Sequence, residues 1–376
     1  MPWNERNRMS LREEFVALAQ RSDANVSALC RRYGISRKTG YKWLDRASES
    51  CADRSRRPHR SPERTAAAIE KRLLNLRDRF PDWGARKLKR YLHDRGHTVL
   101  PAVSTITTVL QRHGRIPAKS SEAAQRWQRF EHAQPNALWQ MDFKGHVAMT
   151  QGRCHPLTVL DDHSRFSVVL HACAGEALED VQPPLIGGFR RYGMPVRISC
   201  DNGPPWGTGR REDGLTRLGA WLIRLGVRLS HARPYHPQTN GKDERFHRTL
   251  KSGLLERRIL QDLHDAQRAF DAFRHLYNHE RPHQALNLDV PISRYRPSER
   301  SFPETPPPID YDPGLAVRCV DACGRITFKG RSFRIAKALH GQRVAMRPNP
   351  EFDGQHIVYY CHQPIRTIDL NTNNVE

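Results

Sequence analysis

The sequence has no long uninterrupted apolar run and no regular framework of paired cysteines. Its longest apolar stretches are broken by charge, as at Arg224 within WLIRLGV, so no segment is predicted to span a bilayer. The opening residues, MPWNERNRMS, lack the apolar core of a secretory signal, and we expect no such signal there. The 8 cysteines are scattered, which favours a reducing compartment. We therefore expect a cytoplasmic protein without membrane contact.

The spacing of cysteine and histidine gives little support for a zinc finger. Cys319 and Cys323 form a lone Cys-x₃-Cys, and a second pair is missing nearby. His93 and His97 have helical spacing, but no paired cysteines follow at finger distance. Nucleic-acid recognition, if present, is expected to depend on helices rather than on zinc.

Acidic residues are scarce relative to basic ones. The chain has 62 Lys+Arg against 40 Asp+Glu, a formal charge of +22 and a pI near 10.2. This balance predicts a polyanionic partner, with nucleic acid as the first candidate. Arginine dominates the basic residues, which suits planar, bidentate contacts with phosphate. The alternative is a basic protein whose charge serves solubility alone. A length of 376 residues favours two to four domains.

Residues 1–50 are predicted to form a helix-turn-helix DNA-binding domain. In NVSALCRRYGISRKTGYKWLDRA, apolar residues recur at helical spacing, Gly34 makes the turn and Ser36 is placed to cap the second helix. This pattern is typical of a helix-turn-helix motif. The second helix would present four residues to DNA: Arg37, Lys38, Thr39 and Lys42. A helical hairpin with a solvated basic face is the plainer alternative.

A basic linker and a second helical module are expected next. Residues 51–64, CADRSRRPHRSPER, carry prolines that break helices, and the arginines include Arg54, Arg56 and Arg57. Such a segment either lies along a DNA groove or is disordered and solvated. Residues 65–118 are predicted to form a second helix-turn-helix-like domain, followed by a polar linker over 119–135. Tandem modules would bind a longer site more tightly through effective concentration.

Residues 136–297 are predicted to form an α/β domain. LWQMDF alternates with period two, PLTVLDDHSRFSVVLHAC reads as a hairpin, and PVRISCD is the next strand. Helical segments then alternate with strands, which favours a mixed sheet covered on both faces. The helical stretch at 176–192 is expected to be interrupted by Pro183 and Pro184. A long helix is expected over about 238–260.

The last part of the chain is predicted to contain a spacer and a small β domain. Residues 298–313 are rich in proline, which favours a semi-rigid linker. Residues 314–376 read as short strands at regular spacing, separated by glycines, which predicts a small β-barrel. This domain would touch DNA or another subunit, or it would serve as a structural cap.

Three acidic residues lie in three distant segments. Asp142 is in LWQMDFKG, Asp201 in RISCDNGPPW and Glu244 in HPQTNGKDERFHRTLK. Two belong to strand-like segments and the third opens a basic helix. Carboxylates gathered from distant segments are what a pair of Mg²⁺ ions needs, because Mg²⁺ prefers hard oxygen ligands.

Other nearby acids fit structural roles better. Asp161 and Asp162 lie in the hairpin turn LDDHSRF, where aspartate commonly bonds its own backbone. Asp243 points about 100° away from Glu244 on a helix. We therefore expect these three outside the metal-binding group.

The motifs around Asp142, Asp201 and Glu244 resemble the integrase-type catalytic core of bacterial insertion-sequence transposases, the DDE group within the RNase H-like superfamily. The resemblance covers residues 136–297 and implies an RNase H-like α/β core between all-α DNA-binding modules and the C-terminal β domain. It implies a transposase that binds terminal inverted repeats and catalyses DNA strand cleavage and strand transfer. Asp142 would bridge two Mg²⁺ ions, for which Mn²⁺ can substitute, while Asp201 and Glu244 would hold one each.

The resemblance also implies partners. Double-stranded DNA would be bound as transposon ends and as target, by a homodimer or higher homo-oligomer associated with the nucleoid. The loop before the last acid contributes Asn240, and Glu244 shares a helical face with His247, Arg248 and Lys251, whose basic members would meet the DNA backbone. The block HERPHQAL at 279–286 also resembles the family, and we expect it to be mainly structural. PWGTGRREDGL looks like a small insertion relative to the family.

Two other functions stay open from the sequence. The first is a DNA-binding regulator with an integrase fold and no catalysis, against which the intact carboxylates argue. The second is a nuclease of RNase H type that acts on RNA–DNA hybrids. Major-groove readout by the helical modules suits duplex DNA better than an A-form hybrid.

Overall fold

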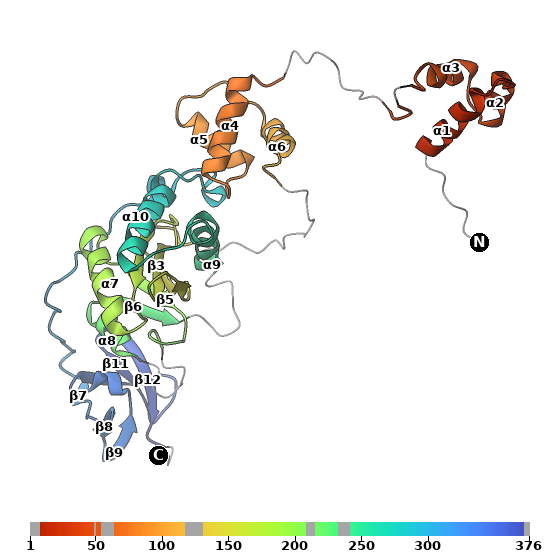
Figure 1. The fold of residues 1–376 in the computed structure, drawn as a ribbon. Helices are drawn as coiled ribbons and strands as arrows, with labels where there is room; N and C mark the ends of the chain where they lie inside the picture. Colours follow the sequence, from red (N-terminus) through yellow and green to blue (C-terminus); the bar gives the residue numbers. More distant parts are fainter. Residues whose placement is uncertain are drawn as a thin grey trace. The chain divides into compact units, whose positions relative to one another are not determined.

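The computed structural model divides the chain into two compact units, Met1–Arg64 and Thr65–Glu376 (Figure 1). Each is considered by itself. Within the described residues, no helix is both long and apolar enough to cross a membrane. The structure describes residues 8–48, 50–53, 64–116, 131–207, 215–231 and 241–371.

The first unit is a three-helix module. Its helices are α1 (Arg8–Ala19), α2 (Val26–Arg32) and α3 (Arg37–Asp45). Gly34 turns the chain with a φ of +64°, and the Ser36 side chain accepts a hydrogen bond from the Thr39 N–H at 3.2 Å. Both predictions are confirmed, and together they fix the start of α3. Phe15, Cys30 and Trp43 form the buried centre.

The second unit begins with another helical module, as predicted. It contains α4 (Ala67–Arg79), α5 (Ala85–His93) and α6 (Val103–Arg112). Leu73, Leu88 and Ile106 are fully buried between these helices, and the ring of Trp83 stacks on Phe80 with centroids 4.1 Å apart. Apolar residues at helical spacing on all three helices therefore pack together into one small core.

The central domain is built on a six-stranded mixed sheet. Its order is β2-β3-β1-β5-β6, and β4 pairs with β3. Strand β1 runs antiparallel to β3 and parallel to β5. The predicted α/β class is confirmed. The strands are β1 (Trp139–Phe143), β2 (Val147–Ala148), β3 (Arg153–Asp161), β4 (Ser167–Cys173), β5 (Arg197–Cys200) and β6 (Arg228–His231).

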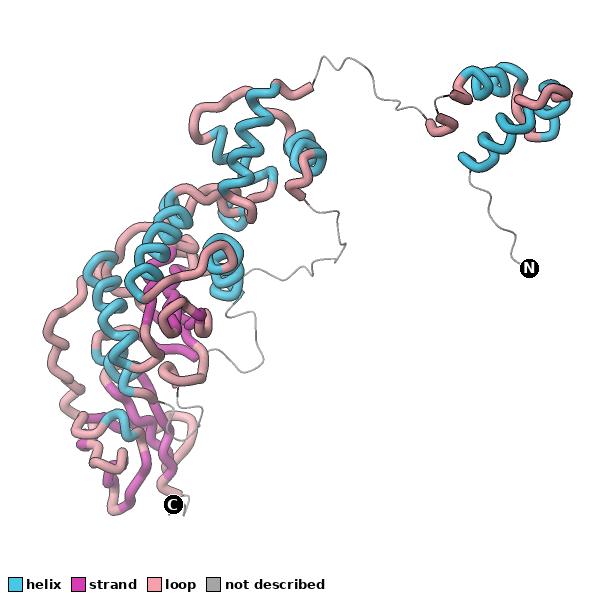
Figure 2. Tube along the Cα trace, viewed as in Figure 1, coloured by secondary structure: helices cyan, strands magenta, loops and turns pink. Residues whose placement is uncertain are grey.

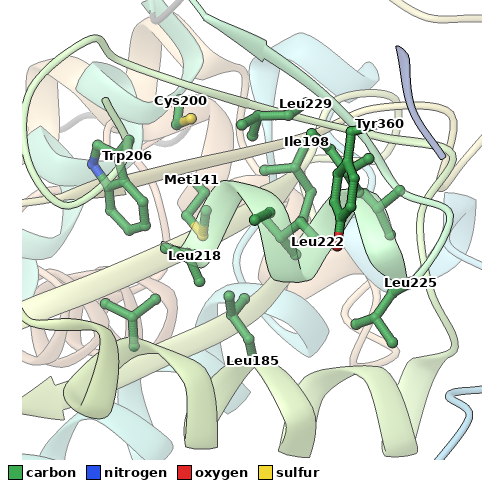
Figure 3. Packing of buried hydrophobic residues seen from close by; sticks show 14 of the residues in the cluster. Met141, Leu185, Ile198, Cys200, Trp206, Leu218, Leu222, Leu225, Leu229 and Tyr360 are labelled. Atoms are coloured by element: carbon green, nitrogen blue, oxygen red, sulfur yellow. The ribbon is translucent and has the colours of Figure 1, made fainter. Parts of the chain in front are cut away.

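Helices cover both faces of this sheet (Figures 1 and 2). One face packs against α7 (Leu178–Tyr192) and α8 (Arg217–Arg224), in the apolar cluster that includes Met141, Leu185 and Leu222 (Figure 3). The other face packs against α9 (Gly241–Leu250) and α10 (Leu263–His279), where Phe246 and Phe270 meet Leu160 and Leu170. The short α11 (Pro291–Arg294) follows.

Two helix predictions differ from the structure. Helix α7 continues through Pro183 and Pro184, although each proline removes one backbone donor. Burial of Val181, Leu185 and Phe189 along its apolar side offsets that loss. The helix expected over 238–260 ends earlier, because α9 gives way at Leu250 to a π-helical turn, Lys251–Leu255. Residues 238–240 lie outside the described part of the chain.

The C-terminal residues form the predicted strands but not the predicted barrel. An open four-stranded sheet has the order β12-β11-β10-β7, and β8 pairs only with β9 among the described residues. Lys329 and Gly330, both with positive φ, close β8 and β9 into a tight hairpin. The strands are β7 (Ala316–Cys319), β8 (Arg325–Phe328), β9 (Arg331–Arg334), β10 (Arg343–Pro348), β11 (Gln355–Tyr360) and β12 (Gln363–Asp369).

The C-terminal sheet packs against the central domain rather than standing apart. The amide of Gln363 bonds both backbone groups of Leu229 on β6, at 2.8 and 3.1 Å. Tyr360 and Val344 belong to the same apolar cluster as the α8 side of the core (Figure 3). The open sheet therefore packs against the central domain instead of closing on itself.

Candidate active site

Asp142 lies on β1, next to the buried Met141. Its carboxylate accepts a hydrogen bond from the N–H of Phe143 at 2.8 Å, which favours the ionised form. Burial and then the charge of Asp201 nevertheless raise the pKa of Asp142 to about 6, with smaller contributions from Glu176 and Glu244. Asp142 is thus a partly buried carboxylate in a negatively charged neighbourhood.

Asp201 follows β5, the parallel neighbour of β1. The register pairs Trp139 with Ile198 and Gln140 with Ser199, and continuing it brings Asp142 beside Asp201. The Asp201 side chain accepts a hydrogen bond from the N–H of Gly203 at 3.0 Å, which shapes the turn that follows β5. Asp142 and Asp201 therefore lie side by side, because β1 and β5 are neighbouring strands of the sheet.

Glu244 is exposed on α9. The opposite side of this helix carries Phe246 and Leu250 into the core, where the Phe246 ring meets Tyr277 of α10 edge-to-face at 4.8 Å. This packing turns Glu244 outward. Its charge still contributes to the raised pKa of Asp142, so the third acid lies in the same electrostatic neighbourhood.

The three acids do not form a compact ligand cage. Within the described ranges, no group of three or more His, Cys, Asp or Glu side chains is close enough together to hold a metal ion. The chemistry of the set still fits a hard divalent cation, because the donors are carboxylates whose mutual repulsion a cation would relieve. Glu176, the other charge near Asp142, is 2.8 Å from the ring of His155.

His247 has a different position from the one predicted. It is buried rather than facing DNA beside Glu244, and its Nε2 lies 2.8 Å from the hydroxyl of Thr158. That hydroxyl donates its one proton to the backbone carbonyl of Asp142 at 2.9 Å, so His247 is the donor to Thr158. Burial, and then the charge of Lys144, lower the pKa of His247 to about 4. A neutral histidine thus ties α9 to β1 at Asp142.

Asp243 is also interior. Only 1% of it is exposed, and its Oδ1 has no hydrogen-bond partner within the described part of the chain. Burial, followed by the charges of Asp142 and Asp162, raises the pKa of Asp243 well above its ordinary value. Asp243 and Glu244 point in different directions from α9, in keeping with their helical spacing, and Asp243 points into the protein.

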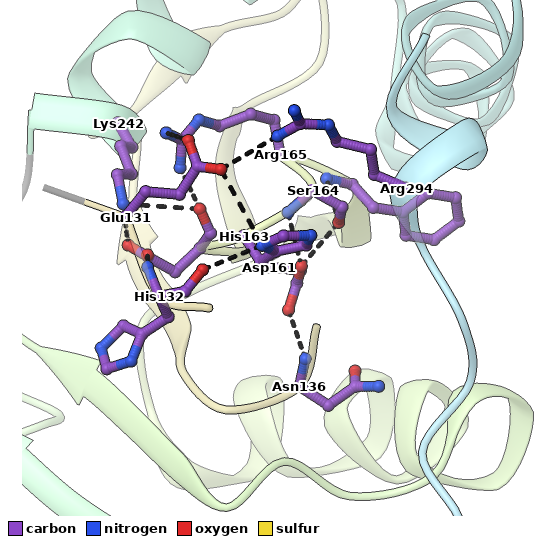
Figure 4. Close-up of polar contacts among 11 residues, drawn as sticks. Glu131, His132, Asn136, Asp161, His163, Ser164, Arg165, Lys242 and Arg294 are labelled. Carbon is purple, nitrogen blue, oxygen red and sulfur yellow. Dashed lines mark hydrogen bonds and ion pairs between the residues drawn. The ribbon is translucent and has the colours of Figure 1, made fainter. Parts of the chain in front are cut away.

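The acids of the hairpin turn form a separate polar network (Figure 4). Asp161 accepts the N–H of Asn136 at 2.6 Å and both the N–H and the hydroxyl of Ser164, at 2.8 and 2.6 Å. Asp162 forms an ion pair with Lys242 in the first turn of α9. These bonds fix the turn and the start of α9, two residues before Glu244.

The predicted DNA-contacting residues have mixed positions. Arg37, Lys38 and Lys42 are exposed on α3, whereas the Thr39 hydroxyl is 2.9 Å from that of Ser36, within the helix cap. The same helix also carries an exposed aromatic residue that was not among the predicted contacts, because Tyr41 is 54% exposed.

The remaining predicted contacts are on α9, on the π-helical turn that follows it, and among residues outside the described ranges. Arg248 and Lys251 are exposed, and the Lys251 ammonium is 3.5 Å from Glu256. Arg54, Arg56, Arg57 and Asn240 lie outside the described residues.

Family models match most parts of the chain. Two models described as integrase core domain match residues 132–237 and 225–291. Residues 315–376 match the C-terminal domain of IS481 family transposases. A helix-turn-helix domain matches residues 11–59, and a homeodomain-like domain matches residues 39–110.

Individual relatives are more distant. The IS407 insertion element uncharacterized 31.7 kDa protein of Burkholderia multivorans is 28% identical over 172 residues, 46% of this chain and 59% of that protein. The Gag-Pol polyprotein of baboon endogenous virus is 27% identical over 222 residues, 53% of this chain and 11% of the polyprotein. The chain thus spans less than two thirds of each of these relatives.

Solved structures show weak overall similarity. The simian T-cell lymphotropic virus intasome in complex with PP2A regulatory subunit B56 gamma has a TM-score of 0.38 at 18% identity, covering 79% of this chain and 99% of that chain. The HTLV-2 integrase catalytic core domain in complex with magnesium has a TM-score of 0.33 at 16% identity, covering 43% and 97%.

The family matches define residues 132–291 as an integrase core. Together with the matched C-terminal model and the IS407 relative, these matches support a bacterial insertion-sequence transposase of the retroviral-integrase-like family.

Proposed function

We propose that the protein is a DNA transposase. Its helical modules bind the terminal inverted repeats of an insertion sequence. Its central domain cleaves and joins DNA strands, and Asp142, Asp201 and Glu244 are its catalytic residues. The observation that carries this proposal is the raised pKa of Asp142, to which burial, Asp201 and Glu244 all contribute. Groups with such perturbed pKa values, gathered from distant segments, are typical of functional sites.

The three carboxylates would hold two Mg²⁺ ions, or Mn²⁺ in their place. Bound there, the ions would stabilise charge on the phosphoryl oxygens and favour ionisation of the attacking oxygen. Asp142 and Asp201 supply ligands from adjacent strands, a rigid support. Glu244 supplies the third from α9. The His247–Thr158 hydrogen bond joins this helix to β3, and the Thr158 hydroxyl in turn donates to the Asp142 carbonyl of β1.

The reaction has two phosphoryl transfers. In the first, water attacks phosphorus at the element's end, and the bond to the 3′ oxygen breaks to leave a free 3′-OH. In the second, that 3′ oxygen attacks a phosphorus of target DNA and displaces a target 3′ oxygen. Two ends must be processed together, so we expect a homodimer or higher assembly on DNA.

The basic surfaces support the DNA-binding part of the proposal. Arg37, Lys38 and Lys42 project from α3, the second helix of the motif, where a major groove would be contacted. Arg248 and Lys251 are exposed beyond Glu244 on α9 and its continuation, where they would meet phosphates next to the acids.

The test is end cleavage and strand transfer by purified full-length protein with Mg²⁺ and the DNA that flanks its gene. Glu244→Gln keeps the shape and removes the charge. Glu256→Gln, an exposed carboxylate just beyond α9, is the matched control. We expect joined products from the wild type and Glu256→Gln and none from Glu244→Gln. End binding without cleavage by any of the three would instead indicate a regulator, and cleavage of RNA–DNA hybrids without joining would indicate a nuclease.

A further inference from the structure

The inward side of α3 is fitted closely to the rest of the first unit. A methyl group at Gly40 would lie 2.6 Å from the sulfur of Cys30 on α2, so the absence of a side chain there lets the two helices approach. Trp43 is 6% exposed, and the guanidinium groups of Arg12 and Arg46 lie 4.1 and 4.8 Å from the centroid of its ring. These contacts fix which side of α3 faces outward.

The outward face of α3 is basic, with one aromatic residue near its middle. At about 100° per residue, Tyr41 points roughly opposite to the buried Trp43. The one exposed acid is the last residue of the helix, so the rest of the face is complementary in charge to a polyanion. The exposed residues of α3 are Arg37, Lys38, Tyr41, Lys42 and Asp45.

Tyr41 differs from the other aromatic residues described in this unit. Phe15 and Trp43 are buried, and the Tyr33 ring meets Phe15 edge-to-face with centroids 5.6 Å apart. Tyr41 is 54% exposed, and within the described residues its side chain has no hydrogen bond and no ring contact. The fold therefore makes little use of the ring and hydroxyl of Tyr41.

The position of Tyr41 suits contact with a base. Helix α3 is the second helix of the helix-turn-helix, the one that lies in the major groove in this class of motif. Among the base edges in that groove, thymine presents a methyl group. An aromatic ring contacts a methyl group by dispersion and by excluding water, and it has few rotamers to fix.

We propose that Tyr41 is a specificity-determining residue of the first helical module, and that its ring contacts the methyl group of a thymine in the terminal repeat. The inference deepens the proposed DNA transposase function and rests on it. Arg37, Lys38 and Lys42 would hold α3 on the phosphates that border the groove, without reading sequence, whereas Tyr41 would read a base.

The experiment measures binding of the full-length protein to duplex DNA by fluorescence anisotropy. One duplex is the DNA end that flanks the gene, the next is that end with deoxyuridine in place of every thymidine, and the last has an unrelated sequence. Deoxyuridine pairs as thymidine does and lacks only the methyl group. The proteins are the wild type, Tyr41→Ala, Tyr41→Phe, Lys42→Gln and Phe352→Ala. Phe352 is the matched control, because it is an aromatic residue of the other unit that is 56% exposed.

On the end duplex, we expect Tyr41→Ala to bind about three- to tenfold more weakly than the wild type, with no change on the unrelated duplex. Tyr41→Phe, which keeps the ring, and Phe352→Ala should match the wild type. Deoxyuridine should weaken binding by the wild type, and this loss should be smaller in Tyr41→Ala because the methyl contact is already gone. The slope of log affinity against log salt should be unchanged in Tyr41→Ala and fall by about 1 in Lys42→Gln.

Several results would overturn the inference while the proposed function stands. Wild-type binding by Tyr41→Ala, or equal weakening on every duplex, would show that Tyr41 does not read sequence. An undiminished deoxyuridine effect in Tyr41→Ala, or weak binding by Tyr41→Phe, would exclude the contact between ring and methyl group. A lower melting temperature of Tyr41→Ala would make the ring structural, and an altered oligomeric state with unchanged affinity would make this face an interface between copies.

Failure of the proposed function would look different. If the wild type binds the end duplex no better than the unrelated one, recognition of the terminal repeat and this inference fail together.

Discussion

Replacing Asp142 with asparagine should stabilise the metal-free protein at neutral pH. The pKa of Asp142 is raised from 3.8 to about 6, so the folded protein holds this proton more tightly than the unfolded chain does. Ionisation of Asp142 therefore costs folding free energy. The cost is absent well below pH 3.8, grows as pH rises and is complete above about pH 6.

The magnitude follows from the two pKa values. A tenfold change in proton affinity is worth about 1.4 kcal/mol, so the full cost is about 3 kcal/mol, and at pH 4.5 it is about 1 kcal/mol. Asparagine has nearly the same shape and keeps an oxygen that can accept the N–H of Phe143. Asp142→Asn therefore removes the charge with little loss of packing.

Urea unfolding in EDTA at pH 7.5 and pH 4.5 measures the effect, with Glu256→Gln as the exposed-carboxylate control. We expect Asp142→Asn to gain about 3 kcal/mol at pH 7.5 and about 1 kcal/mol at pH 4.5. Added Mg²⁺ should stabilise the wild type and leave the variant nearly unchanged, since binding to the folded state alone raises stability. An Asp142→Asn protein that is less stable than the wild type at pH 7.5 would refute the reasoning, because Asp142 would then be a stabilising, structural carboxylate.

Three further substitutions test the contacts around the site and in the first unit. Thr158→Val removes the buried hydroxyl between His247 and the Asp142 carbonyl; it should lower the free energy of unfolding in urea by about 1–3 kcal/mol and slow strand transfer. An unchanged free energy of unfolding and an unchanged strand-transfer rate would show that this link does not hold α9. Lys242→Met leaves Asp162 buried without its ion-pair partner and should cost about 3–5 kcal/mol, most of which Asp162→Asn in the same protein should restore. Gly40→Ala places a methyl group 2.6 Å from the sulfur of Cys30 and should lower the protection of α3 amides in hydrogen exchange by about 1–3 kcal/mol. Protection equal to that of the wild type would contradict this close packing.

Local signals in the sequence predict much of the fold because they act over a few residues. The Gly34 turn, the Ser36 cap and the strands around Asp142 and Asp201 are set by backbone preference and by alternation of side chains. The proximity of Asp142 and Asp201 then follows from the pairing of β1 with β5.

Features that depend on packing between distant segments could not be predicted in the same way. The helical spacing of Glu244 and His247 is compatible with one exposed face, but tertiary packing buries His247 against Thr158. The strands of the last domain are visible in the sequence, whereas closure into a barrel depends on which edges pair and which face meets Leu229. The ion pair between Asp82 and Arg281 joins residues that are far apart in the sequence, and no local sequence pattern predicts it.

The central claim of this account is that Asp142, Asp201 and Glu244 share one divalent-metal site. Electron paramagnetic resonance of Mn²⁺ at pH 7.5, titrated with wild-type protein and with Asp142→Asn, Asp201→Asn, Glu244→Gln and Glu256→Gln, measures this directly. The account predicts that the wild type and Glu256→Gln bind Mn²⁺ alike, and that each of the other three variants binds it more weakly. Equal binding by all five proteins would contradict the assignment of the three acids to a metal site.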